Sequence, residues 1–358
     1  MSQLFKLIIL FIHLPLSAFQ LTHADIIDPR YSWMDDLVEA EFAPYQDKGI
    51  WEKWIKQLKK SPCKKITHYQ IENGVIKGKG QLTSLLTQLQ NDLGLPDLEF
   101  IYFEADGVSS PRQIPQSFAP ILAGSKIKGM GNVILFCDPT YSNSSNDSYN
   151  WSQTYDKVLQ LNSQWDWDEK IDLLLWRGAN TGTNEIYTKN NWHTLTRGRL
   201  VALSEDIPFL IDAKFSHILP WKTNNMKELS SVLPMADERM DLEKQIQYKY
   251  QIAIDGDTCS YPGIKWRLLS NSLLFLPESE LITWFMPALK PYVHYVPIKK
   301  DYSDIIHILD WAEDNDEKCH QIADQGSYFA KTMLGQKQIA IYCYKILLQY
   351  AKLYKSRK

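Results

Sequence analysis

The chain has 358 residues, with 44% hydrophobic residues, 23% charged residues and a formal net charge of −3. These proportions match globular domains and exclude a disordered, collagen-like or coiled-coil chain, and the length predicts about two domains. The slightly negative charge gives no overall electrostatic footprint for nucleic acid or for attraction to an anionic membrane.

An apolar run, Leu7–Phe19, follows Lys6 near the start of the chain. The run falls short of the roughly twenty apolar residues that span a bilayer, and His13 and Pro15 interrupt it. This shape is typical of a secretory signal, with cleavage expected after Ala24. An uncleaved anchor is the alternative, and no membrane span is expected beyond this leader.

The five cysteines are scattered and form no C-x-x-C pair, so they indicate neither a disulfide framework nor a zinc site. One or two bridges remain open in an oxidising compartment. Three glycosylation sequons begin at Asn143, Asn146 and Asn150, and we expect this polar stretch to be an exposed loop.

Helical and strand patterns alternate through the first half of the chain. Asn73-Gly74 between two apolar runs predicts a hairpin, because this pair suits the positive φ of a tight turn. The expected elements are a helix over 32–45, strands over 66–71 and 75–76, a helix over 82–93, and strands over 98–103 and 132–136.

The second half repeats the alternation. The expected elements are a strand over 171–176, an element starting over 199–204, a strand over 250–254, a helix beginning near 264, strands over 272–276 and 292–297, and helices over 302–315, 316–334 and 337–354. Short apolar strands between helices predict an α/β fold with parallel sheets covered on both faces. Ligands bind such sheets at the carboxyl ends of the strands.

Arg177 follows a predicted strand and opens the loop Gly178-Ala-Asn-Thr181-Gly-Thr. A guanidinium beside loop amides and hydroxyls can neutralise a diphosphate. The loop is neither a G-x-G-x-x-G fingerprint nor a P-loop. A structural ion pair for Arg177 is the alternative.

A second candidate phosphate loop runs from Asp255 to Lys265. A strand ends there, small and hydroxyl residues turn, and a helix N-terminus with Lys265 would attract anionic oxygens. An ordinary turn with a solvated lysine is the alternative. Asp255-x-Asp257 also matches the metal-binding Asp-x-Asp of many sugar transferases, but the pattern recurs at Asp166 and Asp314, so no metal is assigned.

Asp106 ends the 98–103 strand region, just before Gly107. A carboxylate facing a cleft there could accept a proton from a bound hydroxyl, and a turn-forming or capping aspartate is the alternative. Glu104 would share its face on a strand. The chain has neither the G-x-S-x-G of a serine hydrolase nor the H-E-x-x-H of a metalloprotease.

Taken together, these segments resemble glycosyltransferase family 90, which includes fungal capsule-associated proteins, lipopolysaccharide-modifying bacterial proteins and protein O-glucosyltransferases. The matching blocks, in order, are 98–106, 164–167, 175–178, 199–204, 248–256, 265–272 and 284–297. The resemblance implies a GT-B fold of two Rossmann-like domains facing a central cleft. It divides the chain into the leader 1–24, an acceptor-side domain 25–165, a nucleotide-sugar domain 166–335 and a terminal helix 336–358 that packs back on the first domain.

The resemblance also implies an inverting reaction of a UDP-sugar without a metal or other cofactor. Asp106 matches the catalytic aspartate of the family. The residues matched to the donor site are Arg177, Gly178, Thr181, Gly256, Asp257, Thr258, Ser260 and Lys265. This chain has Ala-Asp-Gly-Val around the aspartate where the family usually has Arg-Asp-Tyr-Pro. It also departs from the animal members, which have a shorter donor loop with an arginine.

The expected function is transfer of glucose or xylose from a UDP-sugar to a hydroxyl of a glycan or protein acceptor, without nucleic acid. The alternatives are an inert module that binds a glycan or nucleotide sugar, and a metal-dependent transferase that uses Asp255-x-Asp257. The leader predicts the secretory pathway or export, or a cytoplasmic enzyme with an uncleaved anchor.

Overall fold

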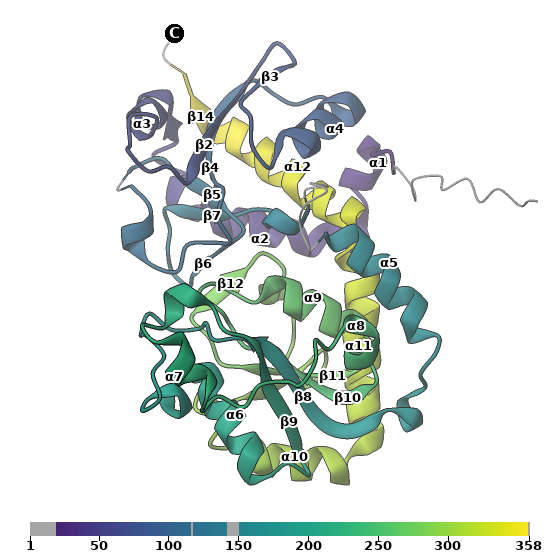
Figure 1. Ribbon diagram of the computed structural model, residues 1–358. Helices are drawn as coiled ribbons and strands as arrows, with labels where there is room; N and C mark the ends of the chain where they lie inside the picture. Colours follow the sequence, from purple (N-terminus) through teal and green to yellow (C-terminus); the bar gives the residue numbers. More distant parts are fainter. Residues whose placement is uncertain (1–18, 116, 142–149, 357–358) are drawn as a thin grey trace, which may run out of the picture.

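A computed structural model describes residues 19–115, 117–141 and 150–356. It contains two five-stranded sheets with helices around them, one sheet in each half of the chain (Figure 1). The α/β class predicted from the sequence is therefore confirmed.

The sheet of the first half is mixed, with the order β3-β2-β4-β5-β7. Strand β2 pairs antiparallel with β3 and β4, and β4, β5 and β7 run parallel. The predicted hairpin is confirmed, because Asn73 and Gly74 take φ values of 50° and 75° between β2 and β3. The strands are β2 (Ile66–Glu72), β3 (Val75–Lys77), β4 (Leu98–Phe103), β5 (Ile121–Ala123) and β7 (Val133–Leu135).

The sheet of the second half is parallel throughout, with the order β13-β11-β10-β8-β9. All its strands therefore end at the same edge, where apolar runs give way to polar loops. The strands are β8 (Ile171–Ala179), β9 (Ile211–His217), β10 (Tyr248–Ile252), β11 (Leu273–Pro277) and β13 (Val296–Ile298).

Some predicted boundaries were wrong. Strand β8 continues to Ala179, so Arg177 and Gly178 are strand residues and not part of the following loop. The helix expected near Ile264 begins at Tyr261, because Pro262 suits the first turn of a helix. The strand expected over 292–297 shrinks to β13, because Tyr292 has a φ of 56°.

The long helices cover both sheets. Helix α12 crosses the first half beside α2 and α4, while α11 packs against α9 and β11 in the second half (Figure 1). The helices are α1 (His23–Ile26), α2 (Ser32–Phe42), α3 (Glu52–Leu58), α4 (Thr83–Leu93), α5 (Trp151–Asn162), α6 (Thr196–Asp206), α7 (Met226–Ser230), α8 (Leu242–Gln245), α9 (Tyr261–Leu269), α10 (Ile305–Asp314), α11 (Asp316–Met333) and α12 (Gln336–Leu353).

The buried apolar residues form two clusters: one surrounds the second sheet, and the other surrounds the first sheet and extends into the second half, where it includes Leu274 of β11. The first cluster takes in buried residues of α12, such as Ile341 and Leu347, and also the start of α9 at Tyr261. Segments from the end of the chain thus complete the core around the first sheet. The expected division of the chain near residue 165 falls between α5 and β8 and stays a prediction.

Two short ladders join distant segments. Strand β6 (Ser125–Ile127) of the first half pairs antiparallel with β12 (Leu281–Thr283) of the second half. Strand β1 (Ile50–Trp51) pairs parallel with β14 (Tyr354–Lys355) at the end of the chain. The β6–β12 ladder fixes a loop of the second half against the first sheet.

A buried ion pair also crosses between the halves. Lys265 Nζ of α9 lies 2.9 Å from Asp138 Oδ2, and the two side chains are 0% and 1% exposed. Lys265 also donates to Thr140 Oγ1 at 3.0 Å and lies 4.7 Å from the ring centre of Trp151. Burial lowers the pKa of the Lys265 ammonium, and the Asp138 carboxylate opposes that shift.

The predicted leader lies outside the described residues up to residue 18. From there Leu21 is buried, and the expected cleavage after Ala24 falls inside α1. Asn143 and Asn146 also lie outside the described residues, but the expected exposure was wrong for Asn150, which is 7% exposed and caps α5. No helix in the described part of the chain has the length and apolarity needed to cross a bilayer.

Replacing Asp138 with Ala leaves the ammonium of Lys265 buried without its carboxylate, which should cost about 3–5 kcal/mol of unfolding free energy. Denaturant unfolding measures this loss. Glu238→Ala, which breaks the exposed pair with Lys244, should barely change the midpoint. Equal midpoints for the two variants would contradict a stabilising role for the buried pair.

Candidate functional site

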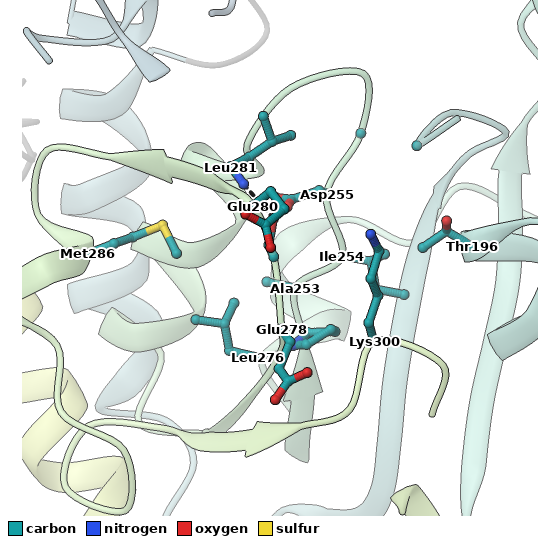
Figure 2. A pocket seen from close by; sticks show the side chains of 14 residues that line it. Thr196, Ala253, Ile254, Asp255, Leu276, Glu278, Glu280, Leu281, Met286 and Lys300 are labelled. Carbon is teal, nitrogen blue, oxygen red and sulfur yellow. Dashed lines mark hydrogen bonds between the residues drawn. The ribbon is translucent and has the colours of Figure 1, made fainter. Parts of the chain in front are cut away.

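A pocket opens at the carboxyl edge of the parallel sheet (Figure 2). Its walls come from the segments after β8, β10, β11 and β13 and from the start of α6. The lining residues are Gly182, Thr196, Ala253, Ile254, Asp255, Gly256, Leu276, Pro277, Glu278, Ser279, Glu280, Leu281, Met286 and Lys300. This is the edge at which parallel sheets bind ligands.

Two glycines let the loops after β8 and β10 approach each other. Gly182 has a φ of 90°, and a Cβ there would lie 2.8 Å from the backbone oxygen of Asp255. A Cβ on Gly256 would lie 3.2 Å from both Arg197 Nη2 and Thr181 Oγ1. Side chains at these positions would push the loops apart and disturb the pocket wall.

Arg197 links the same two loops by hydrogen bonds. Its guanidinium donates to the backbone oxygens of Ala179, Ile254 and Asp255 at 2.9–3.0 Å. Burial lowers the pKa of Arg197, and nearby acidic groups, including Asp255, oppose that shift. The positively charged guanidinium of Arg197 thus lies beside the pocket and is hydrogen-bonded to backbone carbonyl groups.

The pocket presents both a cation and a helix N-terminus. Thr196 is the first residue of the eleven-residue helix α6, and the Lys300 side chain extends into the space between Thr196 and Ile254 (Figure 2). Backbone N–H groups at a helix start favour anionic oxygens. Lys300 and the helix N-terminus thus favour an anionic ligand, while Glu278 and Glu280, which also line the pocket, oppose one.

The Asp255 carboxylate is hydrogen-bonded within the protein and supports the pocket wall. It accepts hydrogen bonds from the Ser260 backbone N–H at 2.8 Å and from the Ser279 hydroxyl. Burial raises the pKa of Asp255, while these two hydrogen bonds oppose the shift. Asp257 is occupied as well, with Lys222 Nζ 2.6 Å from its carboxylate.

The loop residues predicted for the donor site lie in or around this pocket. Gly256 lines it, and Thr258 accepts a backbone hydrogen bond from Gly256 at 3.0 Å. Thr181 faces Gly256, and Ser260 directly precedes α9. The structure thus brings both predicted loops together at one edge of the sheet.

Of the eight predicted donor residues, Gly256 alone lines the pocket, and the other loop residues lie beside it. Three predicted donor residues are held elsewhere by other contacts. Arg177 Nη2 lies 2.7 Å from Asp212 Oδ2 of the neighbouring strand, the structural ion pair that the sequence left as an alternative. Gly178 lies within β8, where a Cβ would meet the Trp176 ring. Lys265 points into the interior toward Asp138 and is fully buried.

Asp106 lies just beyond β4 and is exposed. Its carboxylate is hydrogen-bonded to the hydroxyl of Tyr261, the first residue of α9. Burial raises the pKa of Tyr261 well above its usual value, so the hydroxyl keeps its proton and acts as the donor. The backbone oxygen of Asp106 accepts a hydrogen bond from Ser125 Oγ at 3.3 Å.

Glu104 does not share this position with Asp106. Its carboxylate accepts hydrogen bonds from the Tyr69 hydroxyl at 3.0 Å and from the Gln81 backbone N–H at 3.1 Å. Glu104 therefore fixes the loop before α4. The side chain that faces the α9 start is Asp106.

Within the ranges that the structure describes, no group of three or more His, Cys, Asp or Glu side chains could hold a metal ion. Asp255 and Asp257, the pair considered for a metal, both bond to protein groups.

Sequence reasoning missed Thr196, Ser279 and Lys300 in the pocket and Arg197 beside it. Ser279 and Lys300 follow β11 and β13. Considering the polar residues after every strand of the second half would therefore have identified these two as pocket candidates. The strand expected over 292–297 ended too early to point at Lys300. Thr196 and Arg197 lie ahead of the element that was expected to start at Arg199.

A parallel sheet with glycine-containing loops, a helix N-terminus and a lysine at its carboxyl edge defines an α/β protein with a pocket at that edge. The sequence profile of glycosyl transferase family 90 matches residues 31–358, so the chain belongs to that family.

Curated relatives are protein O-glucosyltransferases. The chain is 24% identical over 299 residues to protein O-glucosyltransferase 2 of Danio rerio, covering 80% of this chain and 56% of the relative. It is 28% identical over 300 residues to protein O-glucosyltransferase 3 of Mus musculus, covering 80% and 55%. It is 30% identical over 202 residues to protein O-glucosyltransferase 1 of Rattus norvegicus, covering 56% and 47%. The chain thus spans about half the length of these relatives.

Replacing Arg197 with Met removes three hydrogen bonds that hold the pocket loops together. Backbone amides over 179–182 and 253–258 should then exchange with solvent faster, because exchange follows local opening. Hydrogen exchange with mass spectrometry measures this change. Arg199→Met, which removes an exposed hydrogen bond to Thr194, is the matched control. Unchanged exchange in both loops of the Arg197 variant would contradict the fastening role.

Proposed function

We propose that this chain is an inverting glycosyltransferase that moves glucose or xylose from a UDP-sugar to a hydroxyl of a protein or glycan acceptor. Family membership and the protein O-glucosyltransferase relatives support the transfer reaction and favour a protein acceptor. Asp106 is the proposed base, and the pocket at the carboxyl edge of the second sheet is the proposed donor site.

The contact between Asp106 and Tyr261 is the observation that carries this proposal. Tyr261 follows Ser260 directly, and Ser260 bonds to the pocket residue Asp255. The proposed base of the first half is therefore one side chain away from the proposed donor loop of the second half. A base and a leaving group must meet in this way for direct transfer.

A second connection supports the same arrangement. Ser125, which bonds to the backbone of Asp106, pairs with Thr283 in the β6–β12 ladder. The segment before Thr283 contributes Ser279, Glu280 and Leu281 to the pocket. The Asp106 loop and the pocket wall thus share one rigid support.

In the proposed reaction, Asp106 takes the proton of an acceptor hydroxyl while that oxygen bonds to the anomeric carbon. The bond from this carbon to the UDP oxygen breaks on the opposite face, and UDP leaves with the electron pair. Lys300, the N-terminus of α6 and loop amides stabilise the developing diphosphate charge, since preorganised donors act most strongly where charge develops.

The finer features follow from the family resemblance. They are a GT-B arrangement of two Rossmann-like domains, divided as the sequence predicts, and a reaction independent of metal. Arg177, Gly178 and Lys265 remain candidates for donor contact only if their present packing rearranges. The predicted leader supports a secretory or exported location, or a cytoplasmic enzyme with an uncleaved anchor.

Asp106→Asn should abolish transfer while UDP still binds, because a general base is typically worth about 10²–10⁴-fold in rate. UDP release with a panel of UDP-sugars, with and without EDTA, measures turnover, and calorimetry measures UDP affinity. Asp36→Asn, an exposed change on α2, is the control. A near-normal rate in the Asp106 variant would remove it as the base. UDP-sugar binding by the native chain without any turnover would support an inert binding module instead.

Lys300→Met should weaken UDP binding about tenfold or more, since a hydrogen bond to a charged group is worth about 1.5–3 kcal/mol. Lys299→Met, a neighbouring exposed lysine outside the pocket lining, should bind UDP as the native chain does. Arg177→Ala is the third variant. A larger loss for Arg177 than for Lys300 would return the diphosphate contact to Arg177.

A further inference from the structure

The chain concentrates positive charge in one short segment. Between Lys48 and Lys65 it has seven lysines, one glutamate and no arginine or aspartate, a formal charge of +6 in a chain of net charge −3. The other residues together therefore carry −9. All seven lysines are exposed, although the overall composition suggested no basic surface.

Aromatic side chains lie among these lysines, two of them half-buried (Trp51 and Trp54) and one exposed (Phe118). The rings of Trp54 and Phe118 lie 5.6 Å apart, and those of Trp51 and Trp54 lie 6.4 Å apart. Phe118 is 67% exposed. Lys53 Nζ lies 5.6 Å and 5.9 Å from the ring centres of Trp51 and Trp54.

The end of the chain adds to the same surface. The β1–β14 ladder pairs Trp51 with Lys355, and Lys355 Nζ lies 5.2 Å from the Trp51 ring centre. Figure 1 shows α3 and β14 at the same end of the first half. We call this region the basic aromatic surface, defined by Trp51, Lys53, Trp54, Lys60, Lys64 and Phe118.

The surface continues to the proposed base. The backbone N–H of Glu104 donates to the backbone oxygen of Lys65 at 2.8 Å, and Asp106 follows two residues later. The segment that carries the lysines therefore ends beside the residues that precede Asp106. The donor pocket proposed above lies in the other half, which leaves this side of the molecule for an acceptor.

We infer that the basic aromatic surface docks an acidic polypeptide segment of the acceptor protein. This inference rests on the proposed function, in which Asp106 deprotonates a hydroxyl of a protein. Lysine ammonium groups complement Asp and Glu side chains and steer their approach, and Trp and Phe are enriched at protein interfaces. Two other lysines of the segment form ion pairs within the chain, Lys56 with Glu52 and Lys59 with Glu99, and are not among the residues that define the surface.

Polyglutamate serves as the probe, and its binding to the full chain is measured at low and high salt. The native chain should bind it, with an affinity that falls as salt screens the charges. The triple variant Lys53→Glu, Lys60→Glu and Lys64→Glu should lose about tenfold or more in affinity, because like charges then face each other. The matched control is Lys157→Glu, Lys189→Glu and Lys227→Glu, which reverses three exposed lysines elsewhere.

A glutamate–tyrosine copolymer tests the aromatic part. Phe118→Ala should weaken its binding, while Phe209→Ala, at a 72% exposed phenylalanine of the second half, should not. Equal losses in both triple variants, or no loss in either, would overturn the inference. Binding to vesicles of phosphatidylcholine and phosphatidylglycerol is measured as well. If the native chain binds these vesicles more tightly than polyglutamate, and the triple variant loses that binding, the surface is assigned to a membrane and the inference is overturned.

Hydrolysis of UDP-glucose without acceptor separates this inference from the proposed function. The triple variant should hydrolyse it at the native rate, because its changes lie away from the donor pocket. If the native chain turns over no UDP-sugar, the proposed function fails even where polyglutamate binding depends on the surface. If turnover is normal and polyglutamate does not bind, only the acidic-acceptor inference fails.

Discussion

The buried ion pair of Lys265 and Asp138 is the constraint on which the rest of the structure depends. Neither charge has access to water, so each needs the other, and the two come from different halves of the chain. The pair holds α9 against the first sheet, and the first turn of α9 then carries Tyr261 to Asp106. The position of one helix thus decides where the carboxylate of the first half meets the loops of the second.

The segment between β11 and β13 has a comparable double role. Its first residues line the pocket, and the residues that follow leave the second sheet and pair with β6. A change in the pocket wall at Ser279 or Glu280 therefore acts on a segment that is also fixed to Ser125. The two sides of the site share a frame, which favours a reaction that requires fixed distances between base, acceptor and donor.

The sequence was informative where structure follows from local pattern. Strand β4, the hairpin at Asn73-Gly74 and helix α12 were predicted almost to the residue, because alternation, turn chemistry and helical spacing are local properties. Arg177 and Lys265 illustrate the limit. Strand β8 continues three residues further than predicted and pairs Arg177 with Asp212 of β9, and Lys265 lies within α9 and faces Asp138. The partners Asp212 and Asp138 are distant in the sequence from Arg177 and Lys265. The strand order that brings Lys300 and Thr196 into one pocket also joins distant segments, so no local pattern could reveal these contacts.

Helix α12 affects the order in which the two halves can fold during synthesis on the ribosome. The core around the first sheet includes Ile341, Tyr342 and Leu347, although the strands of that sheet are complete by residue 135. Domains usually fold in the order in which they are synthesised. Here part of the apolar face of the first sheet stays uncovered until α12 is synthesised, more than two hundred residues after the last strand of that sheet. The second half thus has the opportunity to reach its native structure before the first.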